Sequence, residues 1–263
     1  AIEQGVSGTA NPWTMASSFD LDIMYNRYIT HINPATNKVT LDAPVYYTLN
    51  KSLSQSYVYK MSRHNTIREV GVENLRLVTE FNPSITTTTS AFGTYYSDVN
   101  HAQDGIRMNS VENGWVKGVS IVHFGSDGIF TTNTSRSTII DCKAVDPVSI
   151  IDGGERYGFN TAERSQQLLF KNLYTHKMRH SFVSNGKATA SGIVYQNCVS
   201  DSAYAVSEGH RWWSQGYLFD NYKELVHLAA YERSLGFYNR GSYGTSHGWG
   251  MVTGVAWNCD LAN

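Results

Sequence analysis

The sequence reads LLFKNL at residues 168–173, IVYQNC at 193–198 and YLFDNY at 217–222, and these three copies of one phrase decide the fold. Each copy is a short aliphatic or aromatic run that ends in a polar residue and Asn. Such a run predicts a strand that stops at a turn. Shorter or weaker copies end at four further anchor positions, which are Asn74, Gly118, Asp141 and Asn258.

The spacing of the seven anchors predicts a solenoid. Successive anchors lie 44, 23, 31, 25, 24 and 37 residues apart, so most steps are near one or two units of about 24, with insertions in the others. A period of this size is typical of repeats that bury their apolar faces against one another. The Leu-x-x-Leu-x-Leu spacing of leucine-rich repeats and the 3.6-residue helical period are both missing. The pattern therefore predicts an all-β, right-handed, single-stranded parallel β-helix.

The three cysteines follow the same phrase. Cys142, Cys198 and Cys259 each come directly after an anchor residue. An odd number without a C-x-x-C pair disfavours a disulfide framework or a zinc site. We expect these cysteines to stack inside the coils as small apolar residues, and the anchor side chains beside them to form an Asn/Asp ladder.

Residues 1–65 do not show the period and are expected to form N-terminal strands that cap the end of the solenoid. Within them, 28–32 and 38–42 alternate about the turn-rich segment 33–37, which predicts a β-hairpin. Residues 66–263 are expected to form coils with loop insertions, 79–100 among them as a long loop. We expect one domain over 1–263, as a piece of a longer chain.

Composition excludes two classes of partner. The net charge is −1, so neither nucleic acid nor an anionic membrane surface is an expected partner. No apolar run approaches the ~20 residues of a transmembrane helix, and no signal peptide is visible. Charged residues make up only 16% while Tyr occurs 17 times, a mixture that suits strands, turns and sugar binding.

Several segments resemble those of a known superfamily: RYGFN at 156–160, RHSF at 179–182, GHRW at 209–212 and SHGW at 246–249. Together with the coil phrases, they are similar to the pectate-lyase-like superfamily of right-handed β-helices, especially its secreted bacterial and fungal members. The resemblance implies a secreted, extracellular or periplasmic protein that acts on polysaccharide. The superfamily includes lyases, hydrolases, epimerases and phage tailspikes, so the fold alone does not choose the activity.

Basic residues recur at fixed offsets from the anchors. His210 and His247 each lie 11 residues before an anchor, and Arg211 and Lys187 each lie 10 before one. Equal offsets in consecutive coils place side chains on one face, about 4.8 Å apart. A second row, at offsets of 16 to 18, is formed by Arg156, Arg179 and His180. A row of cations on one face suggests an acidic sugar as ligand.

These rows suggest a lyase that cleaves a uronate-containing polysaccharide by β-elimination. Arg179 and Arg211 would neutralise the sugar carboxylate. The base would be His180 or His210, and the acid Tyr157 or His247. The remaining substrate-binding candidates are Arg156, Lys187, Trp212, Trp213, Arg240 and Trp249. As alternatives, Arg156 and Arg240 would pair with Asp152, Glu155 or Glu208, and the Trp rings would be core packing.

Two other functions stay open. A glycoside hydrolase of the same fold would need two carboxylates, with candidates Asp104, Asp127, Asp152, Glu155, Glu163 and Glu208. A non-catalytic carbohydrate-binding or structural β-helix, such as a tailspike or adhesin domain, is the third hypothesis. The scattered acidic residues define no metal site, so calcium is an option that the sequence does not support, and no other cofactor is expected.

Overall fold

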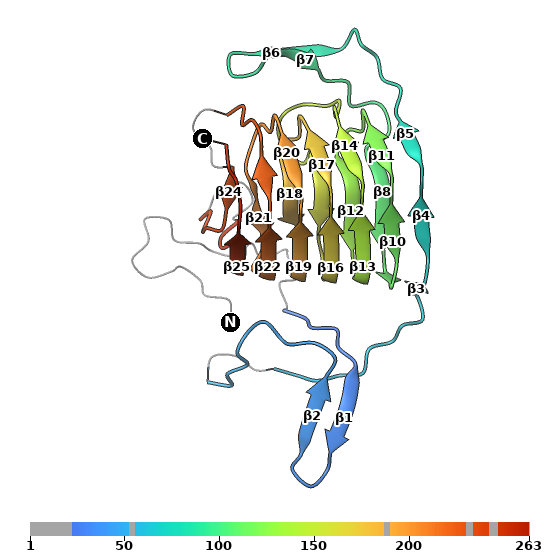
Figure 1. Ribbon diagram of the computed structural model, residues 1–263, viewed down its shortest axis with the longest axis vertical. Helices are drawn as coiled ribbons and strands as arrows, with labels where there is room; N and C mark the ends of the chain where they lie inside the picture. Colours follow the sequence, from blue (N-terminus) through green and yellow to red (C-terminus); the bar gives the residue numbers. More distant parts are fainter. Residues whose placement is uncertain (1–22, 53–55, 187–189, 230–233, 242–246, 263) are drawn as a thin grey trace.

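A computed structural model describes residues 23–52, 56–186, 190–229, 234–241 and 247–262 (Figure 1). The described residues form an all-β protein, and no helix among them could cross a membrane. Three parallel sheets make up most of it, with their strands side by side in Figure 1.

The sheets are named here in the order in which the chain reaches them. The first contains β3 (Ile67–Arg68), β4 (Gly71–Glu73), β9 (Val111–Glu112), β10 (Trp115–Lys117), β13 (Ser135–Ile140), β16 (Gln166–Lys171), β19 (Ser191–Gln196), β22 (Ser214–Asp220) and β25 (Met251–Trp257). The second contains β5 (Arg76–Val78), β11 (Ser120–Val122), β14 (Lys143–Val145), β17 (Tyr174–His176), β20 (Val199–Asp201) and β23 (Lys223–Glu224). The third contains β8 (Asp104–Asn109), β12 (Asp127–Thr132), β15 (Tyr157–Thr161), β18 (His180–Asn185), β21 (Ser207–Arg211) and β24 (Leu235–Gly236).

From β10 onward the chain visits the three sheets in rotation. Each strand pairs in parallel with the strand three places later, for example β13 with β16 and β16 with β19. The repeated sequence phrases coincide with the strands of the first sheet, so the predicted parallel pairing of the repeats is confirmed. Parallel strands need a crossover connection, and here the strands of the other two sheets provide it.

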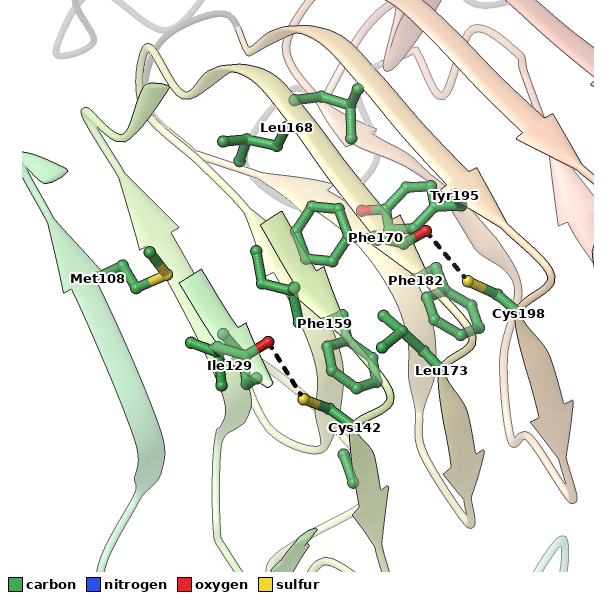
Figure 2. Close-up of a cluster of buried hydrophobic side chains, with 14 of the residues drawn as sticks. Met108, Ile129, Cys142, Phe159, Leu168, Phe170, Leu173, Phe182, Tyr195 and Cys198 are labelled. Carbon is green, nitrogen blue, oxygen red and sulfur yellow. Dashed lines mark hydrogen bonds between the residues drawn. The ribbon is translucent and has the colours of Figure 1, made fainter. Parts of the chain in front are cut away.

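The apolar core lies between the sheets (Figure 2). Ile139, Phe170, Tyr195 and Phe219 occupy one register row of the first sheet. A facing row of the third sheet contains Ile129, Phe159 and Phe182. The Phe159 and Phe182 rings stack with centroids 5.6 Å apart, and the Phe170 and Tyr195 rings lie 4.9 Å apart. Apolar side chains thus occupy equivalent positions in successive repeats, which explains why the apolar phrase recurs.

All three cysteines are free thiols, and two of them lie in the interior as expected. Cys142 and Cys198 are buried, and their Sγ atoms lie 3.6 Å from the backbone oxygens of Val116 and Phe170 (Figure 2). Cys259 is only partly buried. It follows β25, the last described strand of the first sheet, so no further repeat covers it within the described part of the chain.

The predicted Asn/Asp ladder is present. Asn172 donates to Asp141 Oδ1 over 2.9 Å, Asn197 to Asn172 over 3.3 Å, Asn221 to Asn197 over 2.8 Å and Asn258 to Asn221 over 3.1 Å. All of these residues have φ between 51° and 57°. Asn and Asp tolerate this left-handed conformation better than other non-glycine residues, which explains their recurrence at the strand ends.

The N-terminal hairpin is confirmed, but its position differs from the expectation. β1 (Ile29–Asn33) pairs antiparallel with β2 (Lys38–Leu41). The described part of the region does not cover the end of the stack, since Ile67 of β3 stays 55% exposed. Residues of this region instead contact strands of the first sheet in several repeats, and its described segments, 23–52 and 56–63, are called the strap. Its contacts include Tyr28 with Glu112, Arg27 with Gln166, and Tyr25 with Gln215.

The expected long loop at 79–100 contains a hairpin. β6 (Thr86–Thr89) pairs antiparallel with β7 (Gly93–Tyr96). The Thr88 and Thr94 hydroxyls lie 2.9 Å apart across the pair. A run of β-branched threonines favours strand over loop, and this local preference prevails here.

Candidate functional site

The candidate site lies on the third sheet, on the side away from the apolar core. Asp104, Asp127, Tyr157 and His180 are register partners on four neighbouring strands, β8, β12, β15 and β18. Neighbouring strands are about 4.8 Å apart, so their side chains form a continuous polar row. The next strand, β21, extends this polar face with Glu208 and His210, which lie two positions apart along the strand. We call Tyr157, His180, Glu208, His210, Arg240 and His247 the polar cluster.

Glu208 is the centre of the polar cluster and is fully buried. Its Oε1 lies 2.5 Å from His210 Nδ1, 2.5 Å from Arg240 Nη1 and 3.8 Å from His180 Nδ1. Arg240 Nη1 also contacts His210 Nδ1. The carboxylate therefore compensates the guanidinium charge and fixes the imidazole of His210 in place.

His247 completes the row of imidazoles. The His210 and His247 rings have centroids 4.6 Å apart, and their Nε2 atoms lie 3.0 Å apart. The segment after β24 brings both Arg240 and His247 to this point, because the Arg240 amide donates to the Gly248 carbonyl over 2.7 Å. The contact that equal offsets predicted for His210 and His247 is thus present.

Tyr157 lies beside the histidines. Its ring centroid is 5.3 Å from that of His180 and 6.1 Å from that of His210. Its hydroxyl donates to the Gly153 carbonyl over 3.1 Å and accepts from Arg179 Nη1 over 3.2 Å. The hydroxyl is therefore held between a guanidinium donor and a backbone acceptor.

The ionisation of the polar cluster follows from its burial. Burial holds the pKa of His180 well below its usual range, and the positive charge of Arg179 acts in the same direction. Burial also holds the pKa of His210 well below its usual range, with Arg240, His247 and Arg179 adding to the effect. Burial raises the pKa of Tyr157. At neutral pH His180 and His210 are therefore neutral, and Tyr157 keeps its proton.

The other predicted basic residues are placed differently. Arg211 is half-buried, donates to Asn185 Oδ1 over 2.6 Å and lies over the ring of Trp212. Arg156 is only 3% exposed and donates to the Ser149 and Tyr96 carbonyls, so its contacts are structural. Its pKa is lowered by burial. Lys187 lies outside the described residues.

The tryptophan candidates divide by burial. Trp212 is 0% exposed, so neither of its ring faces is offered to a sugar. Trp213 is also buried, with the ring of Tyr47 of the strap edge-on at 6.3 Å. Trp249 is half-buried and pairs with Asn239. Of the three, Trp249 alone keeps an accessible surface on which a sugar could pack.

One group within the described residues has the donor atoms for a metal ion. His180, Glu208 and His210 each offer a ligand atom within 4.8 Å of the others. Two imidazoles and one carboxylate suit zinc or iron. The guanidinium of Arg240, however, already lies on Glu208 and His210. Arg179 and Arg211 add further positive charge near His210, so the surroundings disfavour a cation and favour an anion.

Glu208 and Asp127 are two acidic residues of this face that the sequence predicted only as hydrolase carboxylates or, for Glu208, as an arginine partner. Glu208 and His210 are two positions apart in a strand, and this alternation places both on one face. Asp127 is buried, and its carboxylate accepts from Asn160 over 2.8 Å and from Ser126 over 3.2 Å. Burial, with the neighbouring charge of Asp104, raises the pKa of Asp127 to about 7.

Comparisons with known proteins identify no relative of this chain. No family model, no curated protein and no solved structure matches it.

Proposed function

We propose that the chain is a right-handed parallel β-helix of the pectate-lyase-like kind that cleaves an acidic polysaccharide by β-elimination. The rotation of the chain through three parallel sheets supports the helical architecture. Right-handedness follows the rule that governs crossovers between parallel strands. Polysaccharide enzymes of this kind act outside the cell, so we expect a secreted or periplasmic protein with neither nucleic acid nor membrane as partner.

The observation that carries the proposal is the composition of the polar cluster and its surroundings. Neutral imidazoles and a protonated tyrosine lie together, and Arg179, Arg211 and Arg240 place three positive charges near His210. The neighbouring acidic groups are Glu208 and, one strand from Tyr157, Asp127. The local excess of positive charge around His210 attracts an anion, as a uronate carboxylate requires. Acid and base groups of opposite protonation state stand within one cluster, as proton abstraction and leaving-group protonation require.

The proposed reaction uses these groups in order. Arg179 and Arg211 bind the sugar carboxylate and stabilise the negative charge that develops when the C5 proton leaves. The His210–His247 pair takes that proton, and His180 beside it is the alternative base. The electron pair forms the C4–C5 double bond, the C4–O bond breaks, and Tyr157 gives its proton to the leaving oxygen. Trp249 is the proposed sugar platform.

The test incubates the protein with pectate, alginate, glucuronan and glycosaminoglycans and follows the ultraviolet absorbance of the unsaturated product. We expect absorbance to rise with at least one polymer. His210→Ala should lower kcat roughly 100-fold or more, the usual contribution of a general base. His176→Ala is the matched control, because His176 lies on the second sheet and pairs with Asp146. Full activity of folded His210→Ala would refute this site.

A glycoside hydrolase is the second candidate, favoured by Asp127. A carboxyl group with a pKa of about 7 can act as a general acid, and its register partner Asp104 lies one strand away. New reducing ends without an unsaturated product would support this function. Silence in both assays would favour the third hypothesis, a carbohydrate-binding or structural domain.

A further inference from the structure

Glu208 is bound on Oε1 by two partners of different kind. Arg240 Nη1 and His210 Nδ1 each lie 2.5 Å from this oxygen. Arg240 Nη1 also contacts His210 Nδ1, so this nitrogen has a carboxylate acceptor and a guanidinium donor beside it. A carboxylate oxygen only accepts hydrogen bonds, and a protonated Nδ1 avoids setting a nitrogen lone pair against that oxygen 2.5 Å away. The contact with Glu208 thus favours a proton on Nδ1 of His210.

This tautomer sets the direction of the hydrogen bond between His247 and His210. With Nδ1 protonated, neutral His210 has its lone pair on Nε2, which lies 3.0 Å from His247 Nε2. His247 is then the donor in that contact. A proton that His247 passes to His210 converts His210 to an imidazolium whose Nδ1–H already points at a carboxylate. In the series Glu208, His210 and His247, a carboxylate orients a histidine, as in sites where a third group orients the base.

We propose that Glu208 is a positioning residue that fixes the tautomer of His210 and stabilises its imidazolium during proton transfer. His210 is buried with Arg240, Arg179 and Arg211 nearby, so its protonated form is costly without a negative charge beside it. Arg240 holds the Glu208 carboxylate in place through its Nη1. The proton-transfer role rests on the proposed function, whereas the tautomer does not.

The chain contains a matched control for this pair. Glu224 of β23 is also buried, and its Oε1 contacts His227 Nδ1 while Tyr222 donates to its Oε2 over 2.9 Å. This second Glu–His pair lies on a different sheet from the polar cluster. Glu224→Gln therefore reproduces the loss of a buried carboxylate beside a histidine without changing the candidate site.

The first experiment records long-range ¹H–¹⁵N spectra of the ¹⁵N-histidine-labelled full chain at neutral pH, with His210 assigned from its loss in His210→Ala. We expect the Nδ1–H tautomer for His210 in the unchanged protein. Glu208→Gln should shift His210 toward the Nε2–H tautomer, and Glu224→Gln should leave it unchanged. An Nε2–H tautomer in the unchanged protein would overturn the proposal.

The second experiment measures cleavage of the polymer identified above. Glu208→Gln should lower kcat roughly 100-fold with little change in KM, because the lost interaction acts in the transition state. Glu224→Gln should keep the unchanged kcat. A folded Glu208→Gln protein with full kcat would overturn the positioning role. If the unchanged protein cleaves nothing, the proposed function fails, and the tautomer result still decides whether Glu208 orients His210.

Discussion

At the scale of single residues, burial alters the acid–base behaviour of side chains on the polar face of the third sheet. Asp127 shows this most clearly, since burial raises the pKa of its carboxyl group from 3.8 to about 7. A raised pKa means that the folded protein binds a proton more tightly than the unfolded chain. The stability that comes from this proton is complete below pH 3.8 and is lost as the pH rises through about 7.

Asp127→Asn should therefore stabilise the protein at pH 8 and flatten the fall in stability between pH 4 and 7. The amide keeps an oxygen for Asn160 and removes the buried charge. The gain at pH 8 could reach about 4 kcal/mol, the free-energy equivalent of the shift in pKa. Urea unfolding at several pH values measures it. Asp260→Asn, at an exposed position paired with Lys223, is the control, and an unchanged pH slope in Asp127→Asn would contradict the assignment.

Some residue contacts followed from the sequence and others did not. Equal offsets of 11 residues from an anchor predicted that His210 and His247 meet, and they do. Arg156 was expected to bind substrate, but its guanidinium donates to backbone carbonyls. The offset of a residue places its Cα in the coil, whereas the direction of a long side chain depends on which loop carbonyls lie within its reach.

At the scale of the element, the asparagine ladder sets the turn after each strand of the first sheet. Asn197 is a middle member, donating to Asn172 and accepting from Asn221, with φ of 53°. Its side chain is exposed, so the ladder is stabilised by hydrogen bonds and by backbone conformation rather than by burial. The two contributions can be separated by substitution.

Asn197→Gly should cost about 1 kcal/mol, because glycine adopts the left-handed conformation freely and only the ladder bonds are lost. Asn197→Ala should cost about 2–3 kcal/mol, because the Cβ strain of a left-handed alanine is added. Chemical denaturation of both variants gives the difference. Equal losses would show that φ at this turn does not limit the choice of residue.

At the scale of the whole molecule, the strap along the first sheet joins repeats that are far apart in sequence. Glu112 of β9 is only 1% exposed and is contacted by Arg63, Arg136 and Tyr28. Burial alone would raise the pKa of Glu112. The hydrogen bonds from Arg63 and Tyr28 and the nearby arginine charges outweigh burial and hold the pKa below its usual range. Its stabilisation is therefore present above the unfolded pKa and lost as the pH falls.

Glu112→Gln should release the strap and lower stability by about 3 kcal/mol at neutral pH, since it breaks a buried ion pair and leaves arginines without their partner. Cleavage by trypsin within residues 43–63 should become faster, which mass spectrometry of the fragments detects. Glu69→Gln is the control, because Glu69 is exposed and its carboxylate accepts from Asn113 Nδ2 over 2.6 Å. An unchanged cleavage rate in Glu112→Gln would refute the role of Glu112 as the anchor of the strap.

The amino-acid sequence by itself determined the first-sheet strands that carry the repeated phrase, the parallel pairing of the repeats, the turn asparagines and the buried positions of Cys142 and Cys198. These features depend on local preference and on a period that each repeat restates. Only the tertiary structure decided that the strap lies along the first sheet, that Trp212 is buried, and that Glu208 joins Arg240 to His210. These contacts join segments of unequal length, and the path of an irregular insertion depends on the surface against which it packs, which no periodic pattern encodes.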